Sequence, residues 1–524
     1  MATKLTTFSK FLITLLILGA IVGIGWFIYN KTSVLDDFKE GSGGDRELNR
    51  APGERLSDDE DVLTVQLVTW GGYAPGLYFN EGAEPTTRSR FYQDYGLKVR
   101  FVKNDDLGAA LNAWIADEYD VLVQTADAFP LYTAPEDINA FNPKVFMQVD
   151  WSRGGDVIIA KRGINSINDL RGKRVAVTEP SPSQTLLISS LEAAGLSYDD
   201  IEVVAAQDPI FAAQAFKGND VDAAVVWSPF HLEATRDVAG SKVLLSTIEQ
   251  SHIIGDIMFA KDDFIRENRE QIHAFYEGWM KAIAELHSTP SNQDKAAKLL
   301  AEFLEFPVED AQGAMADVRW TTHGDNVNFF GLNPDYRGIK GDDLYSKMSR
   351  KFYELNQAPA VAPPWRSVAY TGAIQAAMDN LRGAAHAAEE GPAFDPPTEA
   401  ERTAPAIASK PVSINFATGQ STLTENAKTI IDLQFADVAR TFANMRVRIE
   451  GNTDNVGARQ MNMQLSQRRA QAVADYLQQT YGMDPNRFVI IGNGPDKPVA
   501  GCEDNASEDC RARNRRTDFQ LIPG

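Results

Sequence analysis

Hydrophobic and polar positions follow two different periods in the middle of the chain. Short runs rich in β-branched residues predict strands at 62–69, 97–102, 119–124, 157–160, 174–178, 201–204 and 223–227. Between these runs, segments 106–116, 183–194 and 210–217 carry apolar residues at helical spacing. Because strands alternate with helices, we expect an α/β fold, and such folds bind ligands at the carboxyl ends of their strands.

The last fifth of the chain has a different order of elements. Strand-like alternation occurs at 411–416 and 445–450, and helix-like runs occur at 425–444 and 458–480. The last run places Met461, Leu465, Val473 and Leu477 on one face. Asp454 lies just past the second strand, in the loop that opens onto this helix. The pattern predicts a separate α+β domain over 411–524.

Near the N-terminus, residues 11–30 form an uncharged, mostly apolar run between Lys10 and Lys31. At about 1.5 Å per residue, such a helix would span about 30 Å, the hydrocarbon thickness of a bilayer. Trp26 and Tyr29 fall near one end, where aromatic rings favour the interface. Basic residues precede the run and acidic residues follow it, so we expect residues 1–10 to be cytoplasmic. A cleaved signal peptide is the alternative, but no small-x-small cleavage motif follows the run.

Two polar stretches separate these parts. Residues 31–61 are rich in glycine and charge, and residues 384–410 are rich in proline, alanine and glutamate. Both lack apolar periodicity and read as linkers, each with an r.m.s. span of roughly 30 Å if flexible. The predicted order is therefore a cytoplasmic tip (1–10), a membrane helix (11–30), a linker (31–61), an α/β module (62–383), a second linker (384–410) and the C-terminal domain (411–524).

Charge and composition exclude several classes of function. Residues 411–524 hold 13 basic and 13 acidic residues, which leaves 38 basic and 59 acidic residues elsewhere, so the rest of the chain carries the whole net charge of −21. Such a chain repels nucleic acid. The six histidines are scattered, so we expect no metal site and no cofactor. Nucleophile-elbow, zincin and P-loop motifs do not occur, and we expect no enzymatic activity.

Several separated motifs near the C-terminus resemble the OmpA-like peptidoglycan-binding domain. They are the segment EGNTDNVG at 450–457, Asn462, the run SQRRA at 466–470 and the run NRR at 514–516. The resemblance implies that Asp454 and Arg469 hold the zwitterionic end of a diaminopimelate stem peptide, with support from Thr453, Asn462 and Arg515. A carboxylate beside a guanidinium suits a zwitterion, although such a pair is often an ordinary surface salt bridge. Many members have histidine where this chain has Asn452.

Cys502 and Cys510 are the two cysteines of the chain and lie in one acidic loop. In an oxidising compartment we expect them to form a disulfide. OmpA-like domains often carry a disulfide at the corresponding place, so the resemblance points the same way.

The middle of the chain resembles periplasmic substrate-binding proteins of the NMT1/THI5-like type, which serve nitrate, taurine or thiamine precursors. The motifs are WGGYAP at 70–75, INDLRGKRVAV at 167–177 and VDAAVVWSP at 221–229. The resemblance implies a type II module of two α/β lobes that close on a small solute. The two crossovers between the lobes would fall near 148–155 and 249–256.

Strand-end positions in this module give the candidate solute-binding residues. They are Trp70, Tyr73, Thr125, Asp127, Ser181, Ser183, Gln184 and Trp227. Ser183 is equally well explained as a helix N-cap, and the two tryptophans as core residues. The serines before a helix favour an anion, whereas Asp127, Asp156 and Asp208 favour a cation, so the charge of the solute stays open.

Together, these features predict a single-pass inner-membrane protein of a Gram-negative envelope with its bulk in the periplasm. It would bind a small solute and hold peptidoglycan noncovalently, for uptake with an ABC permease or for envelope sensing. The alternative is a structural tether whose middle module binds a protein partner. Residues 11–30 contain no acidic residue, which argues against an ion-driven stator.

Overall fold

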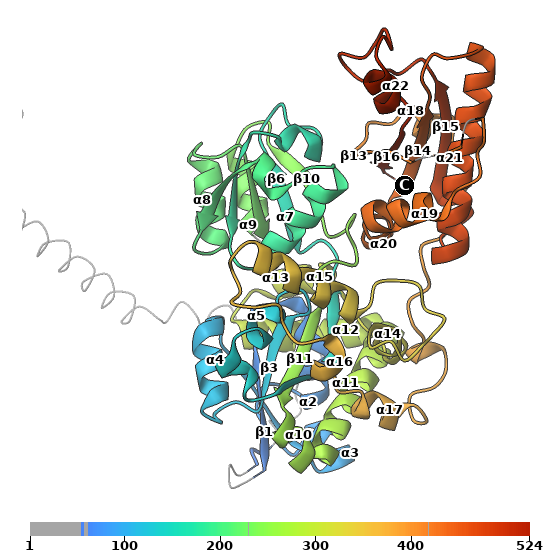
Figure 1. Cartoon of the computed structure of the whole chain (residues 1–524). Coiled ribbons are helices and arrows are strands. Elements are labelled where there is room, and N and C mark those ends of the chain that lie inside the picture. The colour runs from blue at the N-terminus through green and yellow to red at the C-terminus, as the bar shows by residue number, and fades with distance from the viewer. Residues whose placement is uncertain (1–53, 57–60, 229, 415, 418, 524) are drawn as a thin grey trace, which may run out of the picture. The chain divides into compact units, whose positions relative to one another are not determined.

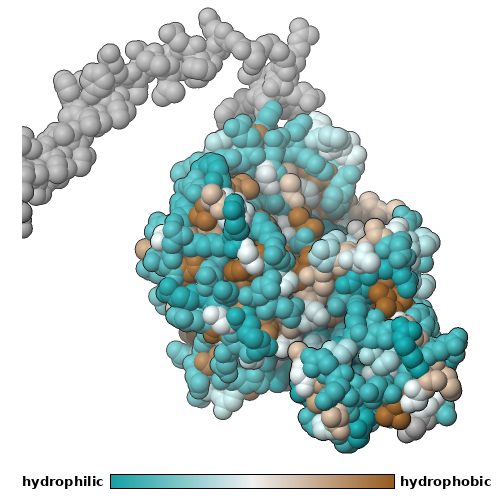
Figure 2. Space-filling model, turned by 90° about the horizontal axis from the view of Figure 1, so that it is seen from above, coloured by the Kyte–Doolittle hydropathy of each residue, from teal (hydrophilic) through white to brown (hydrophobic). Residues whose placement is uncertain are grey.

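A computed structural model describes residues 54–56, 61–228, 230–414, 416–417 and 419–523. In this part of the chain, no helix combines the length and the apolar character that a membrane crossing needs. The membrane helix expected at 11–30 lies outside the described residues. The face drawn in Figure 2 is mostly hydrophilic, and its hydrophobic residues form small separate patches.

The first lobe of the middle module is built on a five-stranded sheet in the order β2-β1-β3-β11-β4. Its strands are β1 (Val62–Leu67), β2 (Lys98–Lys103), β3 (Val121–Thr125), β4 (Pro143–Gln148) and β11 (Asp256–Lys261). The first three strands run parallel, and β11 runs antiparallel between β3 and β4. Figure 1 shows this lobe with α2 (Ala74–Asn80), α4 (Leu107–Ile115) and α11 (Arg269–Ser288) around the sheet.

The second lobe has a five-stranded sheet in the order β10-β6-β9-β7-β8. Its strands are β6 (Asp156–Ala160), β7 (Arg174–Thr178), β8 (Glu202–Ala206), β9 (Ala223–Trp227) and β10 (Lys242–Ser246). The helices α7 (Pro182–Ala193), α8 (Pro209–Lys217) and α9 (Phe230–Asp237) follow β7, β8 and β9 in the chain (Figure 1). The predicted strands and helices of both lobes are therefore present within a few residues of their expected ends.

The chain crosses between the lobes twice at the expected places. It leaves β4 for β6 through a short strand, β5 (Asp150–Ser152), and returns from β10 to β11 through residues 247–255. In the first crossover, β5 pairs antiparallel with β12 (Val318–Trp320). The structure thus confirms a two-lobed α/β module.

Aromatic side chains fill the core of the first lobe. Trp279 on α11 is fully buried and lies among Phe101 and Phe275, with ring centroids 6.2 and 5.6 Å away. A Cβ atom at Gly278 would lie 2.6 Å from the ring of Phe91, so only glycine lets α11 approach this closely. Helices that the sequence reading did not assign also complete the module, namely α12 (Pro290–Leu304), α13 (Val308–Ala316), α14 (His323–Phe329), α15 (Gly341–Glu354) and α17 (Gly372–Ala377).

The C-terminal domain has a four-stranded sheet in the order β13-β16-β14-β15. The strands are β13 (Ala408–Val412), β14 (Arg446–Asn452), β15 (Phe488–Gly494) and β16 (Thr517–Ile522). A helix runs through α19 (Glu425–Ile431), a π-helical turn (Asp432–Ala436) and α20 (Asp437–Thr441), and α21 (Arg459–Tyr481) packs on β14 and β15. The domain is α+β, as the sequence predicts.

Part of the expected second linker also contacts this domain. The first strand begins at Ala408, three residues before the predicted boundary at 411. The guanidinium of Arg448 on β14 donates hydrogen bonds to the carbonyl oxygens of Glu401, Arg402 and Ala404. The end of the 384–410 segment is therefore held against the sheet.

Candidate binding sites

The strand ends of the two lobes place polar side chains around the crossovers. In the first lobe, Thr125 ends β3 and is paired with Asp256 at the start of β11. In the second lobe, Asp156 at the start of β6 is paired with Trp227 at the end of β9. Asp127 follows two residues after the end of β3. This is the edge where an α/β fold binds ligands.

Asp127 is fully buried, with an exposed fraction of 0%. Among the described residues, neither of its carboxylate oxygens has a formed hydrogen bond. Burial raises the pKa of Asp127 to about 6, and the neighbouring hydroxyls of Thr185, on α7, and Thr125 oppose the rise as groups that can donate to the carboxylate, although neither contact has the geometry of a formed hydrogen bond. Both hydroxyl oxygens are themselves buried and without a formed hydrogen bond in the same part of the chain. Unpaired buried polar groups are rare in proteins, so this set is the strongest sign of a ligand site.

Three further buried carboxylates surround the crossovers, and each is held by a donor. Trp70 Nε1 donates to Asp150 Oδ2 at 3.1 Å, Tyr73 Oη donates to Asp256 Oδ2 at 2.5 Å, and Ser152 Oγ donates to Asp156 Oδ2 at 2.7 Å. Burial raises the pKa of all three aspartates, that of Asp156 to about 7.

The charges of neighbouring carboxylates raise these pKa values further. Asp256 acts on Asp150, and Asp127 acts on both Asp156 and Asp256. Like charges in a medium of low dielectric disfavour ionisation, which is why the shifts share one direction. The crossovers therefore carry several buried acids whose ionised forms repel one another, and either protonation or a bound cation relieves that repulsion.

Two glycines let the first crossover pack tightly against Trp70. A Cβ atom at Gly72 would lie 1.6 Å from Asp150 Oδ2, and one at Gly155 would lie 2.2 Å from the indole ring of Trp70. Trp70 is therefore seated between the lobes, with its ring nitrogen bound to Asp150.

The start of α7 contributes a mixture of structural and unpartnered groups. Ser181, not Ser183, caps the helix, since its hydroxyl accepts from Gln184 N at 3.4 Å and donates to Thr178 O at 2.6 Å. The hydroxyl of Ser183 is buried and has no hydrogen-bond partner in the chain. The amide of Gln184 donates to Glu179 Oε1 at 2.7 Å.

The structure also places two other residues that the sequence analysis named as candidates, Asp208 and Trp227. Asp208 accepts from the backbone N–H groups of Ile210 and Phe211 and caps α8, so it serves the helix and not the cleft. Trp227 is half-buried at the end of β9.

Sequence reasoning missed Asp150, Asp256, Ser152 and Thr185 as members of this group. A signal was present for the first three, because they lie in or at the end of the segments predicted to cross between the lobes. Crossover residues form the floor between two lobes, so acidic residues there were candidates for the site.

In the C-terminal domain, Asp454 lies in the loop between β14 and α21. Its Oδ2 accepts from Arg515 Nη1 at 2.8 Å, and its Oδ1 accepts from Val456 N at 3.1 Å. Arg515 Nη2 also donates to Glu508 Oε1 at 2.7 Å. The side chain of Asp454 is 15% exposed to solvent and that of Arg515 is 39% exposed, so a ligand can reach the pair.

The other predicted residues of this site lie around the same loop. The amide of Asn462 donates to the carbonyl oxygens of Asp454 and Val456 at 3.3 and 3.0 Å, which fixes the loop. Thr453 Oγ1 donates to Asp454 O at 2.8 Å. Arg469 Nε donates to Gln420 O at 2.9 Å, and its guanidinium lies 4.8 Å from the ring centroid of Phe416.

Burial lowers the pKa of Arg469, with opposing effects from Asp454, which raises it, and Arg515, which lowers it. The three charges are therefore close enough to act on one another. Asp454 forms its direct ion pair with Arg515, whereas Arg469 faces the same site with its charge not paired to Asp454.

A buried polar network supports this loop from below. Asn493 Nδ2 donates to Glu450 Oε2 at 2.8 Å and to Asn452 Oδ1 at 3.1 Å, and Asn452 Nδ2 donates to Asp518 Oδ2 at 3.0 Å. Lys497 Nζ pairs with Glu450 Oε2 at 2.7 Å. The position where many similar domains have histidine, Asn452, thus serves the network and is buried.

The predicted disulfide is confirmed: Cys502 and Cys510 are bonded, with Cα atoms 5.0 Å apart. Asn514, which ends α22 (Glu508–Asn514), donates to Cys502 O at 3.0 Å. The disulfide loop therefore helps to position Arg515, the next residue in the chain.

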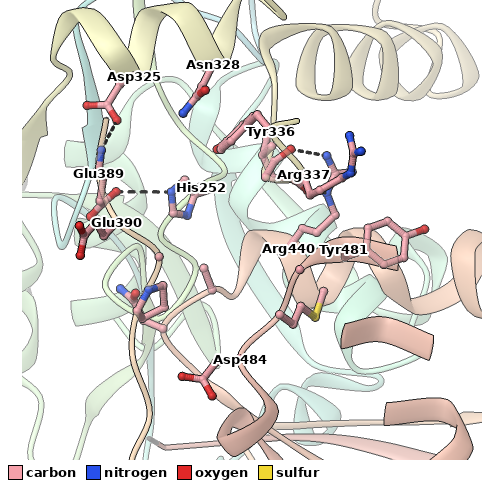
Figure 3. Close-up of a pocket in the computed structure, with 18 of the residues that line it drawn as sticks. His252, Asp325, Asn328, Tyr336, Arg337, Glu389, Glu390, Arg440, Tyr481 and Asp484 are labelled. Atoms are coloured by element: carbon pink, nitrogen blue, oxygen red, sulfur yellow. Dashed lines mark hydrogen bonds and ion pairs between the residues drawn. The ribbon is translucent and has the colours of Figure 1, made fainter. Parts of the chain in front are cut away.

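A cavity of about 790 Å³ lies apart from both groups of predicted residues, none of which lines it. Figure 3 shows Glu389 beside His252, with its backbone N–H toward Asp325. Although burial raises the pKa of Glu389, its bonds to His252 and Arg153 hold that pKa well below its usual range. These charges are satisfied within the chain, which distinguishes this cavity from the site at Asp127.

Comparison with known proteins identifies the two parts separately. Residues 415–515 match the OmpA family, and residues 87–293 match the family described as NMT1/THI5 like. Outer membrane porin F of Pseudomonas aeruginosa is 36% identical over 110 residues, which are 21% of this chain and 30% of that protein. A protein of Brucella abortus named as a binding protein is 27% identical over 152 residues, 28% of this chain and 46% of that protein.

Among solved structures, the chain is similar to the periplasmic aliphatic sulphonate binding protein SsuA of Escherichia coli. The TM-score is 0.47 at 19% identity, covering 60% of this chain and 93% of that one. The nitrate-binding protein NrtA of Synechocystis gives a TM-score of 0.39 at 14% identity, covering 62% and 99%. The chain spans less than half the length of the porin and of the Brucella protein. It combines an NMT1/THI5-like substrate-binding domain with a C-terminal domain of the OmpA family.

Proposed function

We propose that this chain is an envelope protein with two separate ligands: a small solute held between the two lobes, and peptidoglycan held by the C-terminal domain. Asp127 carries the solute-binding half of the proposal. Its buried carboxylate has no formed hydrogen bond in the part of the chain that the structure describes, and burying such a group is unfavourable unless a ligand satisfies it. The NMT1/THI5-like match and the Brucella relative support binding in the same module.

The wall-binding half rests on the loop after β14. Asp454, Arg515 and Arg469 present one carboxylate and two guanidinium groups at a partly exposed loop. Such a set can bind an ammonium and a carboxylate at once, which is the pairing that the end of diaminopimelate offers. The OmpA-family match over this segment supports the assignment of Asp454, Arg469, Thr453, Asn462 and Arg515.

We further propose that residues 11–30 anchor the chain in the inner membrane, with the described part in the periplasm. The uncharged length of the run supports an anchor, and the disulfide suits an oxidising compartment. The biological task would be delivery of the solute to an ABC permease, or sensing of the solute at the cell wall.

A second candidate is a tether whose middle module binds a protein partner. One observation favours it: Ile210 and Phe211 on α8 and Leu232 on α9 are 44%, 50% and 60% exposed. The two helices pack together, so these apolar side chains lie on neighbouring elements of the second lobe. Exposed apolar groups that gather in this way can mark a protein-binding surface.

Co-sedimentation and calorimetry on the full chain distinguish these proposals. Asp454→Ala and Arg469→Ala should each abolish sedimentation with purified peptidoglycan, while Asp509→Ala, an exposed aspartate of the same domain, should not. Retained binding in the first two variants would contradict the wall site. A solute-binding module should give a saturable heat with one class of small molecule, whereas a tether should give none and should lose its partner on Phe211→Ser.

A further inference from the structure

Buried acceptor atoms from both lobes gather at Asp127. Asp127 offers two carboxylate oxygens that are buried and unpartnered, and Thr125 and Thr185 add two buried hydroxyl oxygens that are unpartnered as well. Thr125 and Asp127 come from the first lobe and Thr185 comes from the second, so the acceptors approach from both sides of the crossovers.

We propose that the cleft recognises a small organic amine through its ammonium group, which Asp127 binds with Thr125 and Thr185. This inference rests on the proposed solute binding and names the chemical class of the solute. An ammonium group has three N–H donors and no acceptor, whereas a carboxylate has only acceptors and a hydroxyl can accept. The available atoms therefore match an ammonium in both charge and hydrogen-bond type.

The surroundings of Asp127 reinforce this choice against an anion. The charge of Asp127 acts on Asp156 and Asp256, so the three acids lie close enough to influence one another. At pH 8, above its pKa of about 6, the Asp127 carboxylate is ionised, and a sulfonate or nitrate beside it would meet a buried negative charge whose repulsion is poorly screened. An ammonium there is attracted by the same carboxylate.

The arrangement also disfavours a bound metal ion. Among the residues that the structure describes, no three histidine, cysteine or acidic side chains come together as metal ligands do. Asp150, Asp156 and Asp256 each spend an oxygen on an indole, hydroxyl or phenol donor. Asp150 keeps one buried oxygen, Oδ1, without a formed hydrogen bond among the described residues, whereas both oxygens of Asp127 lack one, so the main contact to the ligand falls to Asp127.

A thermal-shift series on the full chain at pH 8 tests the class. The probes are α,ω-diaminoalkanes and n-alkylamines of two to five carbons, and n-alkanesulfonates and alcohols of the same lengths. At least one amine should raise the melting temperature in a saturable way, and the sulfonates and alcohols should not. In Asp127→Asn, the affinity for that amine should fall at least about tenfold, the loss of one charge-assisted hydrogen bond.

Asp120→Asn provides a matched control at the other end of the same strand. Asp120 lies just before β3 and accepts from Thr64 N at 2.7 Å, so it has a structural partner. This variant should keep the amine response. Asp127→Asn should also raise the melting temperature of the ligand-free chain at pH 8, because it removes a buried charge that no cationic group of the described residues pairs.

The two proposals fail in different ways. A sulfonate that raises the melting temperature equally in wild type and Asp127→Asn would overturn the amine class but leave solute binding intact. If no probe raises the melting temperature, and if ligand-free Asp127→Asn melts at a lower temperature than ligand-free wild type, Asp127 has a structural role. That result would overturn both the amine class and the solute site.

Discussion

Two aspartates occupy equivalent places in this chain, each two residues beyond the end of a strand, yet their surroundings are opposite. Asp127 follows β3, is fully buried, and has no formed hydrogen bond among the described residues. Asp454 follows β14, remains partly exposed, and is paired with Arg515. Burial without a partner destabilises the ionised form of the first carboxylate, whereas an ion pair stabilises that of the second.

This difference predicts different uses of the same chemical group. A buried, unpaired acid selects for cationic ligands, because only a ligand that carries a positive charge compensates the buried carboxylate. Little water has to be displaced when such a ligand binds. An exposed, paired acid is less selective, because the ammonium and carboxylate of a zwitterion can replace the partners in an existing ion pair at little cost. A selective site of the first kind suits the binding of a dilute solute, and a less selective site of the second kind suits the binding of an abundant polymer.

The largest expected effect is the loss of wall binding on Asp454→Ala. Removal of this carboxylate takes away the contact to the ligand ammonium and one of the two ion pairs of Arg515, which keeps its pair with Glu508. Losses of this kind amount to roughly 4 kcal/mol, about a thousandfold in affinity. Sedimentation against a titration of peptidoglycan measures it. An affinity within threefold of wild type would place the wall contact elsewhere.

The next effect concerns the pH dependence of stability at Asp127. Its folded pKa, about 6, lies above the unfolded value of 3.8, so its contribution is fully present below pH 3.8 and is lost as the pH rises through 6. The groups that face it are the hydroxyls of Thr125 and Thr185 and the carboxylates of Asp156 and Asp256.

Asp127→Asn removes this titration. Relative to the variant, wild type should lose about 3 kcal/mol of unfolding free energy between pH 4 and pH 8. Urea unfolding of both chains across this range checks the prediction. Parallel curves for the two proteins would mean that Asp127 ionises in the folded chain as it does in water.

A smaller effect is expected on Tyr73→Phe. The phenol donates to Asp256 at 2.5 Å, and both groups are buried. Deletion of the hydroxyl leaves a buried carboxylate without this donor and should lower the unfolding free energy by about 2 kcal/mol. The same variant should leave wall binding unchanged. A loss of wall binding would show that the two sites are coupled.

The smallest effect is expected on reduction of Cys502–Cys510. The disulfide loop contacts Asn514 and so helps to place Arg515. Without the disulfide the loop is more mobile, and ordering it on binding costs about 1 kcal/mol of binding free energy. The affinity for peptidoglycan should therefore fall about fivefold. The amine response of the middle module should not change. Cys502→Ser/Cys510→Ser in oxidising buffer is the control for the reductant.

A strand or helix could be predicted where the hydrophobic pattern of its own sequence matches the burial of its residues in the fold. The strands β7 and β9 match the predicted segments 174–178 and 223–227, because their apolar runs are bounded by polar residues. The crossovers were located through motifs, and the structure confirms them. In contrast, β10 and β11 were not predicted, although they are at least as long as β7 and β9; their pairing partners are distant in sequence, and the local pattern alone did not single them out.

Single residues were harder to predict than elements. Met461 was expected on the buried face of the last long helix, but it is 70% exposed, and Asn462 and Ser466 occupy the face toward the sheet. Their polar atoms bond to the loop and to Gly494 N, contacts that a hydrophobic pattern does not encode.

The candidate sites show the same limit. Asp127 was predicted from its place after a strand; in the structure it is buried and has no formed hydrogen bond among the described residues, and its role in binding stays a prediction. Asp150 and Asp256 were not predicted, because their importance comes from proximity across crossovers about a hundred residues apart. Ser181 and Asp208 looked equally promising in sequence and are helix caps. Whether an acid pairs inside the chain depends on three-dimensional neighbours.

The central claim is that one chain has two independent ligand sites, each dependent on its own aspartate. The direct measurement takes full-length wild type, Asp127→Asn and Asp454→Ala, and records both the thermal shift with a diaminoalkane and sedimentation with peptidoglycan. We expect Asp127→Asn to lose only the thermal shift and Asp454→Ala to lose only the sedimentation. Loss of both responses in either variant would show that the two sites are not independent, and retention of both responses in both variants would show that neither aspartate binds its ligand.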